Sequence, residues 1–224
     1  YYAIIMLNLY FKEVFMEFRT HSFRYGLEIF TTQQDFRVLW NEVIDSINSI
    51  SDEDIIQYFE NQERRAKSIS EAINNLLDER LTARGWHRQS FIFNDPTYRS
   101  NRGNSNWRLD FAKNDISIEV AFNHGEAVAW NLIKPVLASE LNHVEKDIQT
   151  RAGILICATD EMKSAGGFDG STGSYEKFLQ YLPPLNNLLT VPMVIVGLNA
   201  PRTFRIDHYK EGRNTYGRVV RFND

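Results

Sequence analysis

Hydrophobic residues recur at helical spacing in the first third of the chain. Over residues 35–50 the apolar positions fall three or four apart, which predicts an amphipathic helix, and Ser51 with the acidic residues after it begins a second one. Residues 68–71 have the form of a capping box before a third helix, and Gly85 stands where that helix would end. These stretches predict the helices of a scaffold.

The second half of the chain predicts two more helices. One runs from about residue 127 to 144, and its large apolar side chains would most simply pack into the core: Trp130, Ile133, Leu137 and Leu141. The other runs from Tyr175 to about Tyr181, and we expect it to stop at residues 183–184, which are both proline.

Strand patterns lie between these helices. Two fully apolar runs predict buried strands, at 153–158 and 191–198. Shorter stretches predict further strands at 90–93, 107–112, 116–122, 203–206 and 217–222. Because helices and strands alternate without repeats or low-complexity linkers, we expect a single α/β domain with a mixed sheet and helices on both faces.

The composition is that of an ordinary globular protein, with 224 residues, 43% of them hydrophobic and 24% charged. This excludes a disordered chain, a collagen and a disulfide scaffold. The single cysteine, Cys157, lies in an apolar run and cannot form an intramolecular disulfide, and no Cys/His set has the spacing of a zinc site. A reducing, cytoplasmic setting is therefore the default expectation.

The net charge of −4 hides an asymmetry along the chain. Residues 1–79 carry a net charge of −7, from 14 acidic and 7 basic side chains, which leaves +3 for residues 80–224. The basic excess lies in two arginine-rich stretches, at 80–108 and 202–221. Two interpretations stay open, solvated surface arginines or a surface that contacts phosphates, and the charge alone favours the first.

The N-terminal segment needs its own interpretation. Residues 1–18 are dense in aromatic and aliphatic side chains, yet Asn8, Lys12 and Glu13 interrupt them, so they fit neither a membrane span nor a secretory signal. Because Met16 offers an internal start, we expect residues 1–15 to be an extension that is not native to the protein, and residues 16–224 to form the single domain. The alternative is an N-terminal strand or helix packed on the core.

Two carboxylates lie in a predicted β-hairpin. Two strand-like segments flank a short turn at residues 113–115, so Asp110 and Glu119 can lie opposite one another on neighbouring strands. Glu119 is the only charged residue of its strand and shares a face with Ser117 and Ala121. Such a pair could position Mg²⁺ for attack on phosphate. Spacing alone favours the simpler alternative, an edge hairpin whose carboxylates face water.

Several different short motifs follow one another along the chain, at residues 39–44, 71–86, 109–111, 119–122, 174–176 and 191–198. The pair Asp110 and Glu119 resembles the metal-binding hairpin of PD-(D/E)XK nucleases. The whole series, from about Met16 to Pro201, resembles the BglII/BstYI branch of type II restriction endonucleases. The resemblance implies a restriction-endonuclease-like fold, in which helices flank a mixed β-sheet core, and it supports Met16 as the start.

The resemblance also implies roles for the hairpin residues. Asp110 and Glu119 would ligate Mg²⁺, with the Val120 carbonyl as a further ligand, and a bound water would attack the scissile phosphate in line. The departure from the family is the catalytic position held by Ala121, where the superfamily usually has Lys and this branch commonly has Gln. Alanine can neither orient a water nor stabilise developing charge.

Another side chain could compensate for Ala121. The candidates are Lys113, Glu126 and Gln89, none of which the spacing assigns. Gln89 lies near the place where the branch has a polar residue in its active site, and it is therefore our candidate for a further catalytic residue.

Two segments are candidates for reading the DNA. Asn123 and His124 follow the hairpin where the resembled branch contacts bases in the major groove; the alternative is a loop in which Asn123 caps the next helix. The glycine-rich stretch 165–173 corresponds to a second recognition loop, where we expect Ser171 and Thr172 to contact DNA. It is equally an ordinary long loop, and it has no Gly-Lys-Ser motif for binding a nucleotide.

The resemblance extends to assembly and partners. In the resembled branch, helices near the stretch 127–144 form a two-fold interface, so we expect a homodimer, because a palindromic DNA site needs one active centre per strand. We therefore expect a Mg²⁺-dependent type II restriction endonuclease that cleaves double-stranded DNA at a short palindrome, with GATC in it as in the branch's known sites, alongside a cognate DNA methyltransferase. The alternative is a catalytically weakened or inactive DNA-binding relative, in which Ala121 marks the lost activity.

Overall fold

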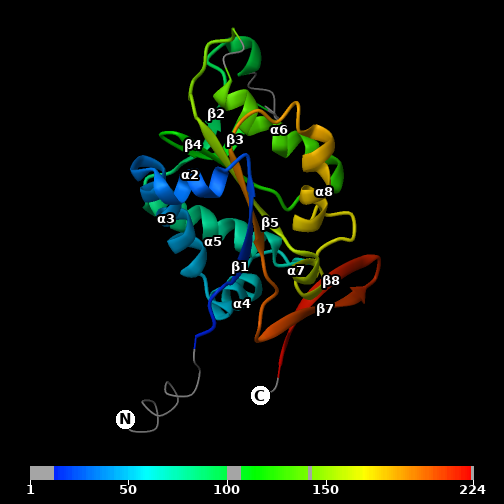
Figure 1. The fold of residues 1–224 in the computed structure, drawn as a ribbon. Coiled ribbons are helices and arrows are strands. Elements are labelled where there is room, and N and C mark those ends of the chain that lie inside the picture. Colours follow the sequence, from blue (N-terminus) through cyan, green and yellow to red (C-terminus); the bar gives the residue numbers. More distant parts are fainter. Residues whose placement is uncertain (1–12, 100–106, 141–142, 223–224) are drawn as a thin grey trace.

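A six-stranded mixed sheet forms the centre of the computed structural model, which describes residues 13–99, 107–140 and 143–222 (Figure 1). The strand order is β1-β6-β5-β4-β3-β2. The middle strands β4, β5 and β6 run parallel, and the outer pairings are antiparallel. The bounds are β1 Phe18–Phe23, β2 His87–Phe91, β3 Arg108–Lys113, β4 Ile116–Val120, β5 Ala152–Ala158 and β6 Met193–Leu198.

Helices cover both faces of this sheet, as the sequence predicts (Figure 1). On one side lie α2 Gly26–Thr32, α3 Gln34–Asn48, α4 Asp52–Asn61 and α5 Ser70–Ala83. On the other lie α6 Val128–Ser139 and α8 Tyr175–Leu185, and the short α7 Asp160–Ala165 follows β5. Two 3₁₀ turns, η1 Pro96–Tyr98 and η2 Gly125–Ala127, complete the helical elements of the described residues.

The period of two in the central strands divides the apolar residues between two cores. In β5, Ile154 and Ile156 pack beneath α3 and α5, whereas Leu155 and Cys157 pack with α6 and α8. Every residue of β5 is buried, which explains its uninterrupted apolar sequence. Burial also raises the pKa of the Cys157 thiol, so this cysteine behaves as a small hydrophobic residue, as expected.

The inward face of α6 differs from the predicted one. Trp130, Ile133 and Leu137 are only partly buried, and Leu141 lies outside the described residues. The buried stripe consists of Val128, Asn131, Leu132, Pro135 and Ala138. These smaller side chains let the helix lie close to the sheet, which large side chains would prevent.

The close approach of α6 depends on a glycine of β5. A Cβ atom placed on Gly153 would lie 2.6 Å from the Cβ of Pro135, which is too close for any other residue without movement of the helix. Gly153 therefore fixes how deeply α6 sits on β5.

The start of α5 also differs from its prediction. The capping box belongs to α4, where Ser51 Oγ accepts from the Asp54 amide at 3.0 Å and Asp54 Oδ2 accepts from the Ser51 amide at 2.9 Å. At α5 the N-cap residue is Ile69, without a side-chain bond, so the capping box predicted at residues 68–71 is wrong. The end of α5 is confirmed, because Gly85 follows it with a φ of +80° and the Trp86 amide bonds to the Leu81 carbonyl.

The prolines at 183–184 do not stop α8, which continues to Leu185. They lie in the last turn, where both are exposed, so carbonyls left without an amide partner remain accessible to water. The helix predicted to reach residue 144 instead ends at Ser139.

A second, two-stranded sheet is formed by β7 Phe204–Glu211 and β8 Asn214–Arg221, which pair as a hairpin apart from the main sheet (Figure 1). The predicted strands at 203–206 and 217–222 cover only part of it. Most of its residues are partly or fully exposed, so polar side chains hide the strand pattern, while Phe204 and Ile206 anchor it in the core.

Candidate active site

The β3–β4 hairpin brings Asp110 and Glu119 together, as the sequence predicts. Phe111 pairs with Ile118, so the next step of the register places Asp110 opposite Glu119. The Val120 amide donates to Asp110 Oδ2 at 2.8 Å and fixes that carboxylate against the neighbouring strand. The two carboxylates therefore share one end of the hairpin.

Glu119 is buried, with only 1% of its surface exposed. Its Oε2 atom accepts from the ammonium of Lys134 on α6 at 2.5 Å, whereas its Oε1 atom has no hydrogen-bond partner within the described part of the chain. Burial and then the charge of Asp110 hold the pKa of Glu119 well above its usual range, against the opposing effect of Lys134. A buried carboxylate with one orphaned oxygen is a strong candidate for a cation ligand.

Asp110 is held by neighbours of a different kind. Burial raises its pKa, and the charge of Lys134, the Val120 amide and the Gln89 side chain oppose that rise. Gln89 is on β2 with a φ of +51°, a strained backbone conformation for a residue with a side chain. Asp110, Gln89 and Val120 line one pocket of about 230 Å³, so Gln89 lies beside Asp110.

These donors fit a hard divalent cation. Two carboxylates and the Val120 carbonyl are the oxygen ligands that Mg²⁺ takes, with water and a substrate phosphate to complete its shell. The described residues contain no group of three or more His, Cys, Asp or Glu side chains placed to hold a metal ion. The fit therefore rests on the carboxylate pair and on the unpartnered Oε1 of Glu119.

The structure separates the other proposed compensating residues from this site. Lys113 points to the opposite face of the sheet, where its ammonium bonds to Glu42 at 2.7 Å and to the Arg84 carbonyl at 2.6 Å. Glu126 is exposed in η2. Neither contacts the carboxylate pair among the contacts found in the described residues.

Lys134 is the site residue that the sequence analysis missed. It lies in a helix and is 15 positions beyond Glu119, so no strand or hairpin spacing points to it. One signal was available, because Lys134 is the only charged residue between Glu126 and Glu140.

The two candidate DNA-reading segments lie side by side. His124 Nδ1 is 2.8 Å from Ser171 Oγ, the Gly125 amide donates to the Ser171 carbonyl, and His124 forms an isolated bridge with Thr172. Asn123, His124 and Ser171 are exposed, whereas only 7% of Thr172 is exposed. The side chain of Thr172 is therefore the least accessible of the four.

Asn123 does not cap the next helix. The N-cap residue of α6 is Ala127, and the Asn123 carbonyl oxygen Oδ1 instead accepts from Asn131 Nδ2 at 3.2 Å. The alternative interpretation of Asn123 as a helix cap is therefore wrong, and the residue is tied to the middle of α6 through its side chain.

Most arginines of the two basic stretches are paired within the molecule. The pairs include Arg80 with Glu79, Arg88 with Asp78, Arg99 with Asp147, Arg202 with Glu17, Arg205 with Asp207 and Arg221 with Glu53. Arg102 lies outside the described residues. Such pairing favours the interpretation of these stretches as solvated surface, with Lys210, Arg213 and Arg218 left exposed on the β7–β8 hairpin.

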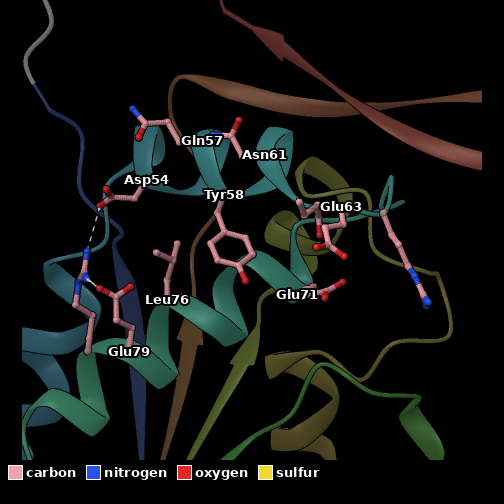
Figure 2. Close-up of a pocket in the computed structure, with 11 residues that line it drawn as sticks. Asp54, Gln57, Tyr58, Asn61, Glu63, Glu71, Leu76 and Glu79 are labelled. Carbon is pink, nitrogen blue, oxygen red and sulfur yellow. Dashed lines mark hydrogen bonds and ion pairs between the residues drawn. The ribbon is translucent and has the colours of Figure 1, made fainter.

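A wide pocket of about 880 Å³ lies between α4 and α5 (Figure 2). Its walls carry several acidic side chains, among them Asp54, Glu63, Glu71 and Glu79. Arg64 and Arg80 also line it, so acidic side chains outnumber basic ones, and the hairpin carboxylates do not line this pocket. We therefore do not assign it to the nuclease chemistry.

The mixed sheet, the helices on both faces and the carboxylate pair on adjacent strands define a restriction-endonuclease-like protein. The family model for restriction endonuclease BglII/BglIII matches residues 18–198, and the chain belongs to this family of site-specific DNA endonucleases. The family and the fold expected from the sequence motifs are thus confirmed. No curated protein matches the chain.

Two solved structures share the fold. The crystal structure of restriction endonuclease BglII complexed with a DNA 16-mer aligns with a TM-score of 0.59 at 16% identity, covering 92% of this chain and 100% of that one. The crystal structure of free BglII aligns with a TM-score of 0.53 at 15% identity and the same coverage. At these identities the likeness concerns the fold. Within the described residues, no helix is long and apolar enough to span a membrane.

Proposed function

We propose that this protein is a type II restriction endonuclease that uses Mg²⁺ to hydrolyse duplex DNA at a short palindrome. The observation that carries the proposal is the pair Asp110 and Glu119 on adjacent strands, with Oε1 of Glu119 buried and unpartnered. A buried carboxylate next to a second, partly buried one is costly without a cation. Membership of the family supplies the class of substrate.

The residues at the site would have separate roles in binding the metal and in holding its ligands. Asp110, Glu119 and the Val120 carbonyl would hold Mg²⁺, which when bound activates a water and neutralises charge that develops on the phosphate. The Val120 amide holds Asp110 in place, and Lys134 holds Oε2 of Glu119. Gln89, beside Asp110 in the same pocket, is placed to orient a water or a phosphate oxygen by hydrogen bonding.

Asn123, His124, Ser171 and Thr172 form the proposed DNA-reading surface. The bond between His124 and Ser171 joins the two segments, so they would meet a duplex as one unit. Asn and His side chains can both donate to and accept from base edges in the major groove. The DNA 16-mer bound in the structure of BglII, which shares this fold, supports DNA as the partner.

The proposed target and assembly rest on the resemblance to this branch of restriction endonucleases. A homodimer would supply one active centre to each strand of a palindrome, and GATC is our candidate for the core of the site. A cognate DNA methyltransferase would protect the DNA of the host.

Cleavage of unmethylated plasmid and phage DNA in Mg²⁺ tests the proposal, with Asp110→Ala prepared in parallel. We expect discrete fragments from the wild-type protein and none from the variant, and the fragment ends give the site. In the same assay, His124→Ala is expected to weaken cleavage at that site. Fragments from Asp110→Ala at the wild-type rate would refute the assigned metal ligand.

A second candidate function is favoured by Ala121, which directly follows β4 and stands where the resembled branch has a polar catalytic side chain. In that case the protein would be a DNA-binding relative with weakened or no activity. Binding of duplex DNA without cleavage in Mg²⁺ or Mn²⁺ would select this candidate.

A further inference from the structure

The active site contains a positive charge that does not come from the hairpin. Lys134 Nζ lies 2.5 Å from Oε2 of Glu119, and only 12% of the Lys134 side chain is exposed. Its helix is otherwise uncharged and packs its small apolar residues on the sheet. Lysine is rarely buried to this degree unless it is paired, so the position of its ammonium is set by Glu119.

Position 121, where the resembled branch carries a longer side chain, is buried against α6. Ala121 is 1% exposed and packs in the same core as Val128 and Leu132 of α6. Gly153 beneath Pro135 holds α6 close to the sheet, so the helix cannot withdraw to admit a longer residue without losing that contact. The same close packing brings Lys134 within reach of Glu119.

We propose that Lys134 is the lysine of this active site, carried by α6 in place of the residue missing at position 121. The inference rests on the proposed nuclease function. Lys134 acts through Glu119 and is therefore a positioning residue. It fixes Oε2 and leaves Oε1 as the oxygen that would bind a cation, and its charge offsets the negative charge of the two carboxylates that would otherwise repel a phosphate.

Lys113 provides a matched control for this role. It is also a largely buried lysine paired with a glutamate, but its partner is Glu42 and it lies on the other face of the sheet. Removal of the Lys113 ammonium leaves Glu42 with the Trp86 indole N–H as a donor at 2.9 Å, and of the two lysines only Lys134 touches the carboxylate pair.

The experiment compares Lys134→Met, Lys134→Arg and Lys113→Met with the wild type. Cleavage of a duplex that carries the mapped site is measured with enzyme in excess, in Mg²⁺. Binding of the same duplex is measured in Ca²⁺, and the melting temperature is measured without metal. Lys134→Gln is added because its amide still donates to Oε2 while the charge is lost.

We expect Lys134→Met and Lys134→Gln to slow cleavage about 100-fold, the scale seen when one preorganised charge-stabilising group is removed, with DNA affinity changed less than about threefold. Lys134→Arg should recover a substantial part of the rate. Lys113→Met should lower the melting temperature and leave the cleavage rate close to that of the wild type.

Other outcomes overturn the inference in distinguishable ways. Wild-type cleavage by Lys134→Met, or an Arg variant no faster than the Met variant, would reduce Lys134 to a structural ion pair while the nuclease function stands. A wild-type protein that binds DNA and does not cleave would show that Lys134 does not replace the missing residue. A wild-type protein that neither binds nor cleaves DNA would refute the proposed function itself.

Discussion

Glu119 carries a cost that the rest of the site only partly offsets. Its carboxylate is almost fully buried beside Asp110, and a single ammonium serves both groups. Removal of two like charges from water is unfavourable unless each finds a partner. The fold therefore holds the pair in a state that a divalent cation would relieve.

This strain predicts a pH dependence of stability in the absence of metal. The folded protein keeps a proton on Glu119 at pH values where the unfolded chain has released it, because the pKa of Glu119 is raised well above 4.5. The stability that Glu119 contributes is therefore present at low pH and is lost as the pH rises through the raised pKa. Glu119→Gln removes this titration.

We expect the melting temperature of Glu119→Gln to exceed that of the wild type increasingly as the pH rises from about 5 to about 8, the range above the usual pKa of a glutamate. The two proteins should converge near the lower end. Melting curves in metal-free buffer measure this, and parallel pH profiles would contradict it. The variant should also lack Mg²⁺-dependent cleavage.

For single residues, the sequence predicted those contacts that follow from the spacing within one hairpin. The turn at 113–115 and the period of two were enough to bring Asp110 to Glu119. Lys134 could not be found in this way, because its contact with Glu119 depends on how α6 packs on the sheet. Tertiary packing of this kind leaves no trace in the spacing of residues.

Two serines of similar local sequence have different roles at helix starts. Ser51 and Ser68 each precede an acidic residue by three positions, but only Ser51 forms a capping box. The Ile69 amide donates to the Gly166 carbonyl, so a tertiary hydrogen bond satisfies the amide just before α5. The helix then begins one residue further on, at Ser70. A motif of four residues cannot reveal that contact.

The difference is measurable as stability. Ser51→Ala should lower the free energy of unfolding by about 1 kcal/mol, because the Asp54 amide loses its acceptor. Ser68→Ala should change it by less than about 0.5 kcal/mol, because the Ser68 hydroxyl bonds only to the Ser70 hydroxyl and, at 3.5 Å, to the Ser70 amide, and no capping box is lost. Urea unfolding of both variants tests this, and equal losses would show that both serines cap their helices.

For the whole molecule, the order of helices and strands was predictable because the two buried strands and the amphipathic helices have strong patterns. The mixed sheet with helices on both faces is confirmed. The β7–β8 hairpin was not recognised as a separate sheet, since few of its residues are buried. The identity of the inward face of α6 was also missed, because the largest apolar side chains were assumed to be the most buried.

The assembly makes a prediction at this scale. Light scattering in solution should give twice the chain mass of 26.1 kDa, since two-strand cleavage at a palindrome calls for a two-fold pair of active centres. Cleavage by a protein that stays at 26.1 kDa, both free and bound to DNA, would contradict the dimer and leave the nuclease assignment intact.

Helix α6 contacts both the proposed DNA-reading surface and the carboxylate pair. Asn131 bonds to Asn123 in the proposed DNA-reading surface, and Lys134, three residues further along the helix, bonds to Glu119. A helix turn is a stiff connection, so a displacement of Asn123 against a wrong base would be transmitted to the ammonium beside Glu119. The discrimination between DNA sequences would then depend on the rigidity of α6, because a wrong sequence would displace the Lys134 ammonium from Glu119.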